Sequence, residues 1–499
     1  MNTLAGKPFL TAAIACLFVW GCAAGPDFRR PDAPGATGYT SIPPPEQTAA
    51  APEAGGEAQR FISGMDIPGA WWTLFHFDPL DRLIRDAFSQ SPTLALARAR
   101  VREAQENRRA AAGGLYPEVT ADASASRQRA SGAAFGQPEA GSATFNLLNA
   151  SLEASYSPDL FGSLKRQLES LDAQVEVQQF QYTAAYLSLS TQLVVTAIRE
   201  ASLAAQLQAA QEVVTLAARS LTIAEKRLDI GGIALADVLA QRTLLAQARA
   251  VVPPLEGSLA QARHQLAVLT GRPPAEAKLP EIDFSQWSLP TEIPVSLPSA
   301  LVRQRPDILT AEALLHGACA LVGVATANLY PQLTLSASLG QTAATGGALF
   351  DSASTIWSVG AGLLQPVFRG GTLTARKRAA IAVYDQAWAQ YQETVLQAFR
   401  EVADLLRALE ADARTLQAAA EAEAAAQAAL ALADQQFAVG AISELLLLDA
   451  QRRQWETRLA TIQARAARFT DTAALFQAMG GGWWNRDLPM GPTYRETEG

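Results

Sequence analysis

Side chains that could catalyse a reaction or hold a metal are few and scattered in this chain. The 499 residues contain three histidines and three cysteines, none close to another in sequence: His76, His264, His316, Cys16, Cys22 and Cys319. A metal cage or a thiol-based active site needs several such groups at short spacings. No nucleophile elbow, phosphate loop or paired-acid arrangement is evident either. We therefore expect no enzyme, no cofactor and no disulfide framework, and Cys319 fits a small buried apolar residue.

Cys22 directly follows an N-terminal segment with the features of a signal peptide. Lys7 precedes an apolar stretch from Phe9 to Trp20, which is too short to span a bilayer and suits the core of a signal peptide. The stretch ends at Val19-Trp20-Gly21-Cys22, the pattern of a lipoprotein signal peptide. We expect residues 1–21 to be removed and Cys22 to be lipidated, and Ala23, rather than Asp, favours sorting to the outer membrane. An ordinary signal peptide with an incidental cysteine is the alternative.

Four later segments alternate apolar and polar residues: 119–126, 148–156, 332–340 and 357–363. Period two over about nine residues is typical of a half-buried strand, and the length suits a tilted transmembrane strand. Loops rich in Gly, Ala and Ser, at 127–143 and 343–354, would join the strands into two hairpins. No other stretch approaches 18 uninterrupted apolar residues, so we expect no transmembrane helix.

Four strands cannot close a barrel by themselves, because bacterial barrels begin at about eight strands. Open strand edges are not tolerated in lipid. Either several chains pool their strands, or the hairpins form a soluble sheet on a helical body. The signal peptide favours the first interpretation.

The chain is also a tandem duplication. Leu115-Tyr116-Pro117 recurs as Leu329-Tyr330-Pro331, and the glycine turn at 229–233 recurs at 438–442. Ala240-Gln241-Arg242 recurs as Ala450-Gln451-Arg452. A repeat this long is a copied domain rather than a solenoid unit.

Long helices follow each predicted hairpin. Apolar residues recur at alternating spacings of three and four, which is typical of coiled-coil packing. The two seams are Leu164, Leu168, Leu171, Val175, Gln178, Tyr182, Ala185 and Leu189, and Ile381, Tyr384, Trp388, Tyr391, Val395, Ala398, Val402, Leu405 and Leu409. A helix from Leu164 to Arg227 would be roughly 95 Å long.

These patterns predict six segments along the chain. They are a signal peptide (1–21), an extended N-terminal segment (22–70), a first repeat (71–270), a proline-rich linker (271–300), a second repeat (301–484) and a flexible tail (485–499). In each repeat a helix precedes a β-hairpin, at about 117–157 and 331–366. Long helical hairpins follow, at about 163–270 and 371–478. The fold class is mainly α with a small β part.

Several motifs, in order, resemble the TolC-like outer-membrane efflux factors, specifically their lipoprotein (NodT-like) branch. They are Cys22-Ala-Ala-Gly-Pro-Asp-Phe-Arg-Arg-Pro31, Trp71-Trp72 with Phe77-Asp-Pro-Leu80, Pro158-Asp-Leu-Phe-Gly162, Arg305-Pro-Asp-Ile308, Gly362-Leu-Leu-Gln-Pro-Val-Phe-Arg-Gly-Gly371, Leu448-Asp-Ala-Gln-Arg452 and Gly480-Gly-Gly-Trp483. The resemblance implies a homotrimer in which twelve strands form a β-barrel and twelve helices form a periplasmic tunnel. The linker at 271–300 and the C-terminal end would form an equatorial belt.

The resemblance also implies functional positions. Leu445, Asp449 and Arg452 stand where relatives narrow the periplasmic tip, and their spacings of four and three place them on one helical face. The alternative is an ordinary surface Asp–Arg pair. In the first repeat, Ala240 stands where Asp449 stands. The turns that contain Gly231, Gly232 and Asp237, and Gly440 and Ala441, resemble the tips that meet a periplasmic adaptor.

The function implied is a passive exit duct for drugs or other small solutes. An inner-membrane proton-driven pump would supply the energy and an adaptor would connect pump and duct. The exit duct of a type I protein secretion system is the nearest alternative, and a lipoprotein spacer without a pore is a third. The net charge of −8 argues against nucleic acid as a partner.

Overall fold

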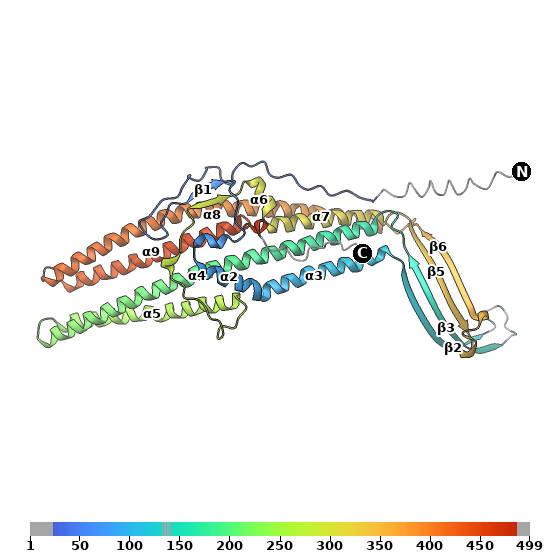
Figure 1. The fold of residues 1–499 in the computed structure, drawn as a ribbon, viewed down its shortest axis with the longest axis horizontal. Coiled ribbons are helices and arrows are strands. Elements are labelled where there is room, and N and C mark those ends of the chain that lie inside the picture. The colour runs from blue at the N-terminus through green and yellow to red at the C-terminus, as the bar shows by residue number, and fades with distance from the viewer. Residues whose placement is uncertain (1–22, 132, 134–135, 137–138, 140, 487–499) are drawn as a thin grey trace. The chain divides into compact units, whose positions relative to one another are not determined.

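Four helices of two repeated lengths dominate the computed structural model, which describes residues 23–131, 133, 136, 139 and 141–486 (Figure 1). Helices α4 (Ser163–Asp229) and α8 (Thr372–Ala438) have 67 residues each, and α5 (Leu235–Leu269) and α9 (Glu444–Ala478) have 35 each. The expected signal peptide, Cys22 and most of the expected tail lie outside the described residues. Equal helix lengths confirm the tandem duplication.

Each repeat begins with shorter helical elements. The first has a 3-10 helix η1 (Trp71–Phe75), α2 (Asp78–Gln90), α3 (Pro92–Ala112) and η2 (Gly113–Leu115). The second has α6 (Pro298–Gln304) and α7 (Pro306–Ala327). Both α3 and α7 start at a proline, where the missing N–H costs nothing. Helix α7 is long and apolar enough to cross a membrane, although we expected no such helix, but 67% of its most apolar window is buried within the chain. That burial is typical of a core helix.

The packing of the long helices agrees only partly with the predicted seams. In α8, the buried residues Tyr391, Val395, Ala398, Val402 and Leu409 belong to the predicted seam. In α4, most of the predicted seam is half-buried, and the buried positions include Ala173, Val177, Leu187, Val194 and Ile198 instead. A helix that packs against more than one neighbour buries more than one stripe, which a single heptad seam does not describe.

Four antiparallel strands form one sheet in the order β2-β3-β5-β6. They are β2 (Glu118–Ser131), β3 (Ser142–Tyr156), β5 (Gln332–Ala343) and β6 (Thr355–Leu364). The hairpins of the two repeats join through β3 and β5, where Leu152 lies opposite Leu339. Two 3-10 turns, η6 (Gly346–Ala348) and η7 (Ser352–Ser354), occupy the second hairpin loop.

The first hairpin is longer than predicted. Residues 127–131 were expected in a loop, yet they continue β2, and Arg129 lies opposite Thr144. Alternation stops at Arg127 because polar residues then occupy both faces, but backbone pairing does not require an apolar face. The side chain of Arg129 also donates to Ser142 Oγ at 2.8 Å.

The residues of the predicted linker form a small parallel sheet with the N-terminal segment. Strand β4 (Glu292–Val295) pairs with β1 (Arg60–Ser63), and the 3-10 helix η5 (Phe284–Gln286) precedes it. A core of aromatic rings lies beside them, with Trp71 stacked on Phe476 at 5.4 Å and Phe75 on Phe469 at 5.9 Å. A final 3-10 helix, η8 (Trp483–Asn485), ends the described chain.

The chain divides into two compact units that cut across the repeats. One comprises Met1–Arg30, Val101–Gln178 and Ala311–Tyr391, and contains the four-stranded sheet. The other comprises Pro31–Arg100, Gln179–Thr310 and Gln392–Gly499, and contains the aromatic core and both helical turns. Each unit draws on both repeats, so the repeats are copied segments of sequence rather than separate packing units.

Candidate functional site

The three predicted constriction residues lie along the first turns of α9. Leu445 is 74% exposed in the single chain, and Asp449 and Arg452 follow it at helical spacing. The two charged side chains form a direct pair, with Arg452 Nη2 at 2.8 Å from Asp449 Oδ1. Both partners of this pair belong to α9.

Asp449 has a second cation that the sequence reasoning missed. Arg453 Nε donates to Asp449 Oδ2 at 2.8 Å, so each carboxylate oxygen has its own arginine. Hydrogen bonds from Arg452 and Arg453 lower the pKa of Asp449 below its usual range. Arg452 also lies 3.3 Å from Glu456. The i,i+4 spacing of Asp449 and Arg453 was the available signal. The carboxylate is therefore ionised at neutral pH.

The same position of the first repeat carries no charge. Helices α5 and α9 start at Leu235 and Glu444, so Ala240 is equivalent to Asp449. When α5 and α9 are aligned on their first residues, Ala240-Gln241-Arg242 is shifted by one residue from Ala450-Gln451-Arg452. The resemblance of those tripeptides was thus misleading about which side chains are equivalent.

Both helical turns have the same backbone construction. Gly231 and Gly440 each have φ of 75°, which glycine adopts without strain. In the first turn Gly232 N donates to Arg227 O at 2.7 Å, and in the second Ala441 N donates to Gln436 O at 2.8 Å. This pattern is a Schellman-type helix end. Asp237 caps the start of α5, because its Oδ2 accepts from Ala234 N at 3.2 Å.

Polar contacts connect the α4–α5 hairpin to the α8–α9 hairpin, both beside the turns and further along the helices. Gln241 donates to Glu444, and Arg458 lies 2.5 Å from Glu212. The guanidinium of Arg227 also lies over the ring of Phe437, 5.3 Å from its centre. An exposed ion pair contributes about 0–1 kcal/mol, so these contacts hold the hairpins together only weakly.

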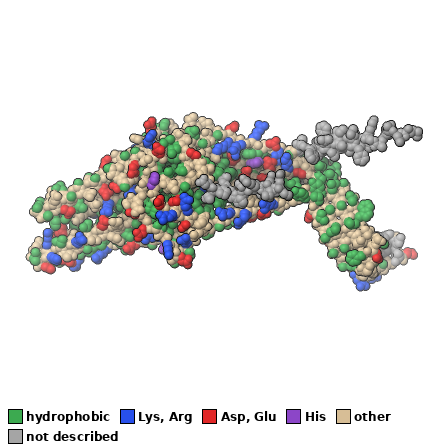
Figure 2. All heavy atoms as spheres, in the orientation of Figure 1, with side chains coloured by type: hydrophobic (Ala, Val, Ile, Leu, Met, Phe, Trp, Pro, Cys, Tyr) green, Lys and Arg blue, Asp and Glu red, His purple; other side chains and the backbone are tan. Residues whose placement is uncertain are grey.

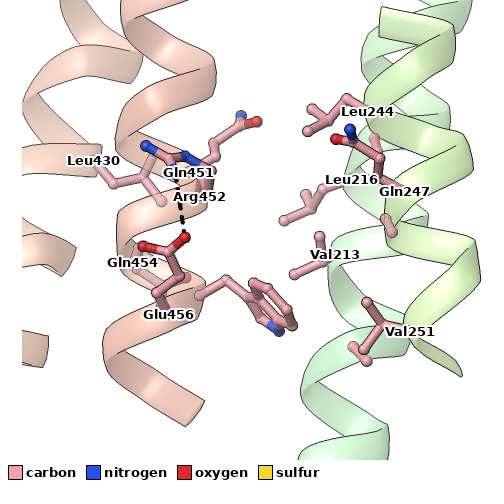
Figure 3. A pocket seen from close by; sticks show the side chains of 14 residues that line it. Val213, Leu216, Leu244, Gln247, Val251, Leu430, Gln451, Arg452, Gln454 and Glu456 are labelled. Carbon is pink, nitrogen blue, oxygen red and sulfur yellow. Dashed lines mark hydrogen bonds and ion pairs between the residues drawn. The ribbon is translucent and has the colours of Figure 1, made fainter. Parts of the chain in front are cut away.

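A cavity of about 170 Å³ lies between the two hairpins (Figure 3). Leu216, Val213 and Leu244 face it from α4 and α5, and Arg452 and Glu456 lie across from them on α9. Trp455 also lines the cavity, and its indole N–H has no hydrogen-bond partner among the described residues. The predicted constriction is therefore next to a loosely packed region rather than a tight core.

No group of three or more His, Cys, Asp or Glu side chains that could hold a metal occurs in the described part of the chain. Cys319 is buried, and burial raises the pKa of its thiol. The predicted constriction residues lie at the start of α9, and the predicted adaptor-contact residues lie in the two helical turns and at the start of α5.

The sheet has one polar and one apolar face. Ser336, Ser338 and Ser358 share one face with Glu153, while Leu335, Ala337 and Val359 share the other. Hydrophobic side chains are visible over the strands close to the helices in Figure 2. This is the pattern of a strand with lipid on one side and an aqueous bore on the other.

The sequence profile of the outer membrane efflux protein family matches residues 83–272 and 297–481. The chain belongs to this family. It is 32% identical to the pyoverdine export outer membrane protein OpmQ of Pseudomonas putida, over 89% of this chain and 94% of that protein. It is 29% identical to the probable efflux pump outer membrane protein TtgC of the same species, with 96% of each chain covered.

A solved structure of the outer-membrane channel OprN is similar with a TM-score of 0.79 and 30% identity, covering 93% of this chain and all of that one. This efflux protein is thus the outer-membrane channel of a tripartite efflux system, and it extends into the periplasm. It works as a homotrimer with a periplasmic adaptor and an inner-membrane pump. Trimerisation resolves the strand problem, because three four-stranded sheets close one barrel with no edge in lipid.

Proposed function

We propose that this channel is a passive exit duct for drugs or other small solutes, with an inner-membrane proton-driven pump as its energy source. The observation that carries the proposal is the continuity of each long helix with a two-faced sheet, which provides a wall for one bore across membrane and periplasm. Relatives described as exporting pyoverdine and toluene support small solutes as the cargo.

The start of α9 would form the periplasmic gate. Around a threefold axis, three Leu445 side chains can meet as an apolar iris. Three Asp449 carboxylates, each paired with Arg452 and Arg453, would form a ring of ion pairs beside it. The arginine pairs of Asp449 hold these carboxylates ionised and in position. Since Ala240 occupies the equivalent place on α5, the α8–α9 hairpin would control closure and the α4–α5 hairpin would not.

The two helical turns would receive the adaptor. Ile230 is 83% exposed and Val439 is 80% exposed, so each turn presents an apolar side chain beside its glycine. The adaptor-contact residues would be Gly231, Gly232, Asp237, Gly440 and Ala441. Relatives often carry a tyrosine before the turn, whereas Leu228 and Phe437 stand here, so the details of the contact would differ.

Lipidation of Cys22 would anchor the chain to the outer membrane. Cys22 lies outside the described residues, but Ala23 packs close to Gly162, and Ala24 N donates to Phe161 O at 2.9 Å. The described chain thus begins on the helical end that adjoins the sheet, where a membrane anchor is needed. Mass spectrometry of the mature N-terminus would detect the acyl chains.

Planar-bilayer recording of the purified trimer tests the duct and its gate together. We expect a low conductance for the wild type and a severalfold higher conductance for Leu445→Ala and Asp449→Ala, because each removes a group from the constriction. Arg414→Ala, on the exposed surface of α8, is the control and should conduct like the wild type. No conductance from any of these trimers would falsify the duct and favour a spacer without a pore.

A type I secretion duct with protein cargo is the alternative. The lipoprotein signal and the relatives named for pyoverdine export and toluene efflux favour small solutes, but none of them identifies the pump. Crosslinking in cells followed by identification of the captured inner-membrane protein separates the two. A proton-driven pump supports the proposal, and an ATP-binding-cassette partner alone would overturn it.

A further inference from the structure

Two cavities follow the same side of α7 in the unit that contains the sheet. The cavity next to the strands has a volume of about 330 Å³ and lies between α7 and the start of α8, with Arg369 and Arg376 on its wall. The second has a volume of about 410 Å³ and continues along α7 past Leu314. Leu321 lines both, so the two cavities adjoin, and the one next to the strands carries the two arginines. We call the two cavities together the junction groove, defined by Leu314, Leu321, Val324, Arg369 and Arg376.

The strands show which side the junction groove faces. Gln332 and Leu364 line it and lie opposite each other in the β5–β6 ladder. Side chains alternate along a strand, so these two share the face of Ser336, Ser338 and Ser358. That polar face borders the bore, and the groove opens on the same side.

The contacts of helix α7 also indicate that the junction groove faces the bore. His316 and Cys319 contact the N-terminal segment, with the His316 ring stacked on Phe28 at 4.4 Å and Cys319 Sγ at 3.7 Å from Pro26 O. At about 100° per residue, Leu314 and Leu321 lie on the opposite side of the helix. With Cys22 anchored in the membrane as proposed above, this segment would run outside the tunnel, and the far side of α7 would face the bore.

The charge in the junction groove is uncompensated. Arg369 and Arg376 are both exposed, and neither forms an ion pair within the part of the chain that the structure describes. No Asp or Glu lines either cavity. The remaining wall is apolar or neutral, with Leu314, Leu321, Val324, Leu364 and Leu373 as its large side chains.

We propose that the junction groove is a binding site for amphiphilic anions in transit through the duct. Arg369 and Arg376 bind the anionic group, and the apolar part of the solute lies along Leu321 and Leu314. The inference rests on the proposed function, because it adds a substrate class to that exit duct. Guanidinium groups suit carboxylate, sulfonate and phosphate, which accept paired hydrogen bonds. The site is open to water, so binding is weak and reversible, as passage requires.

Equilibrium dialysis of the trimer in lipid nanodiscs tests the site with naphthalenesulfonate, a soluble anion with an apolar ring. We expect saturable binding of one molecule per protomer above that of empty nanodiscs, weakened by added salt. The double substitution Arg369→Gln/Arg376→Gln should weaken binding at least about tenfold, since it removes both charged hydrogen-bond donors of the groove. Leu321→Gln should weaken it as well, through the apolar wall.

Arg378→Gln is the matched control. Arg378 is also exposed on α8 but lies about 200° around the helix from Arg376, so this variant should bind like the wild type. Naphthylmethylammonium, of similar size and opposite charge, should show no saturable binding. Equal binding of the two probes, or unchanged binding in the arginine double variant, would overturn the proposal. Absence of probe binding together with conductance in the Leu445→Ala trimer would reject only the groove. Absence of conductance in the wild-type, Leu445→Ala and Asp449→Ala trimers alike would reject the duct.

Discussion

Two charged residues, the buried Arg468 of α9 and the half-buried Asp412 of α8, show how single side chains affect stability. Arg468 is fully buried and donates to Glu57 O at 2.6 Å and to Thr48 Oγ1 at 2.9 Å, which attaches the N-terminal segment to α9. Burial lowers the pKa of Arg468 to about 10. The positive charge of Arg468 lowers the pKa of the nearby Asp412. Burial and the neighbouring Asp471 carboxylate have the larger effect, and they raise the pKa of Asp412 to about 7.

The raised pKa of Asp412 makes stability depend on pH. In the unfolded chain an aspartate titrates near 4, so the folded state binds this proton more tightly. The free energy of unfolding therefore falls as pH rises from about 4 to about 7 and stays low above that. Asp412→Asn should remove this part of the slope and raise the Tm of the trimer at pH 8, measured by calorimetry.

Asp404→Asn is the control for this prediction. Asp404 lies on the same helix with a side chain that is 74% exposed and an arginine at 4.0 Å, so its removal should leave the pH slope unchanged. If Asp412→Asn lost as much Tm between pH 5 and pH 8 as the wild type, the titrating group would lie elsewhere.

At the scale of elements, alternation predicted all four membrane strands and heptad spacing predicted α4 and α8, because these patterns record which face is buried. Helices α5 and α9 were predicted from the glycine turns and the duplication. Alternation and heptad spacing gave wrong positions where the buried residues of an element do not lie on a single face. The α4 seam was misplaced because Ala173 and Val177 are buried on the side of α4 that faces α7. Strand β2 was predicted to end before Arg127, where only backbone pairing continues. The β1–β4 pairing has no periodic signal, since it depends on two distant segments that the fold brings together.

The two faces of β6 should respond differently to the same charge. Val359 lies mid-strand on the apolar face and is 77% exposed in the single chain. Val359→Arg would place a guanidinium in lipid at a cost of about 2–4 kcal/mol near the bilayer midplane. We expect much less folded trimer in the outer membrane, measured as the heat-modifiable band on gels of membrane fractions.

Ser358→Arg provides the matched comparison. Ser358 is the adjacent residue on the polar face, 2.8 Å from Ser338 Oγ, and its replacement would point into the bore. The trimer yield should stay near that of the wild type. Equal losses for the two variants would mean that the polar and apolar faces are not bore and lipid.

For the whole trimer, the charges on the polar face of the sheet decide which ions the barrel prefers. Glu118, Asp122 and Glu153 share that face in the register of β2 and β3, and none of the described β2, β3, β5 or β6 residues on it is Lys or Arg. Rings of carboxylates attract cations and repel anions. Arg369 and Arg376 oppose this preference, because they lie at the bore where the strands meet the helices.

The zero-current potential across a salt gradient measures the balance between these two sets of charges. The triple substitution Glu118→Gln/Asp122→Asn/Glu153→Gln should shift the potential towards anion preference, and Arg369→Gln/Arg376→Gln should shift it towards cations. Opposite shifts are expected because the two sets lie in series along one bore, so each sets a barrier for ions of its own sign. Lower ionic strength should enlarge both shifts, since screening weakens. If Arg369→Gln/Arg376→Gln left the zero-current potential unchanged at low salt, these two side chains would lie outside the conduction path. Anions would then cross the barrel without a cationic site to concentrate them where the strands meet the helices.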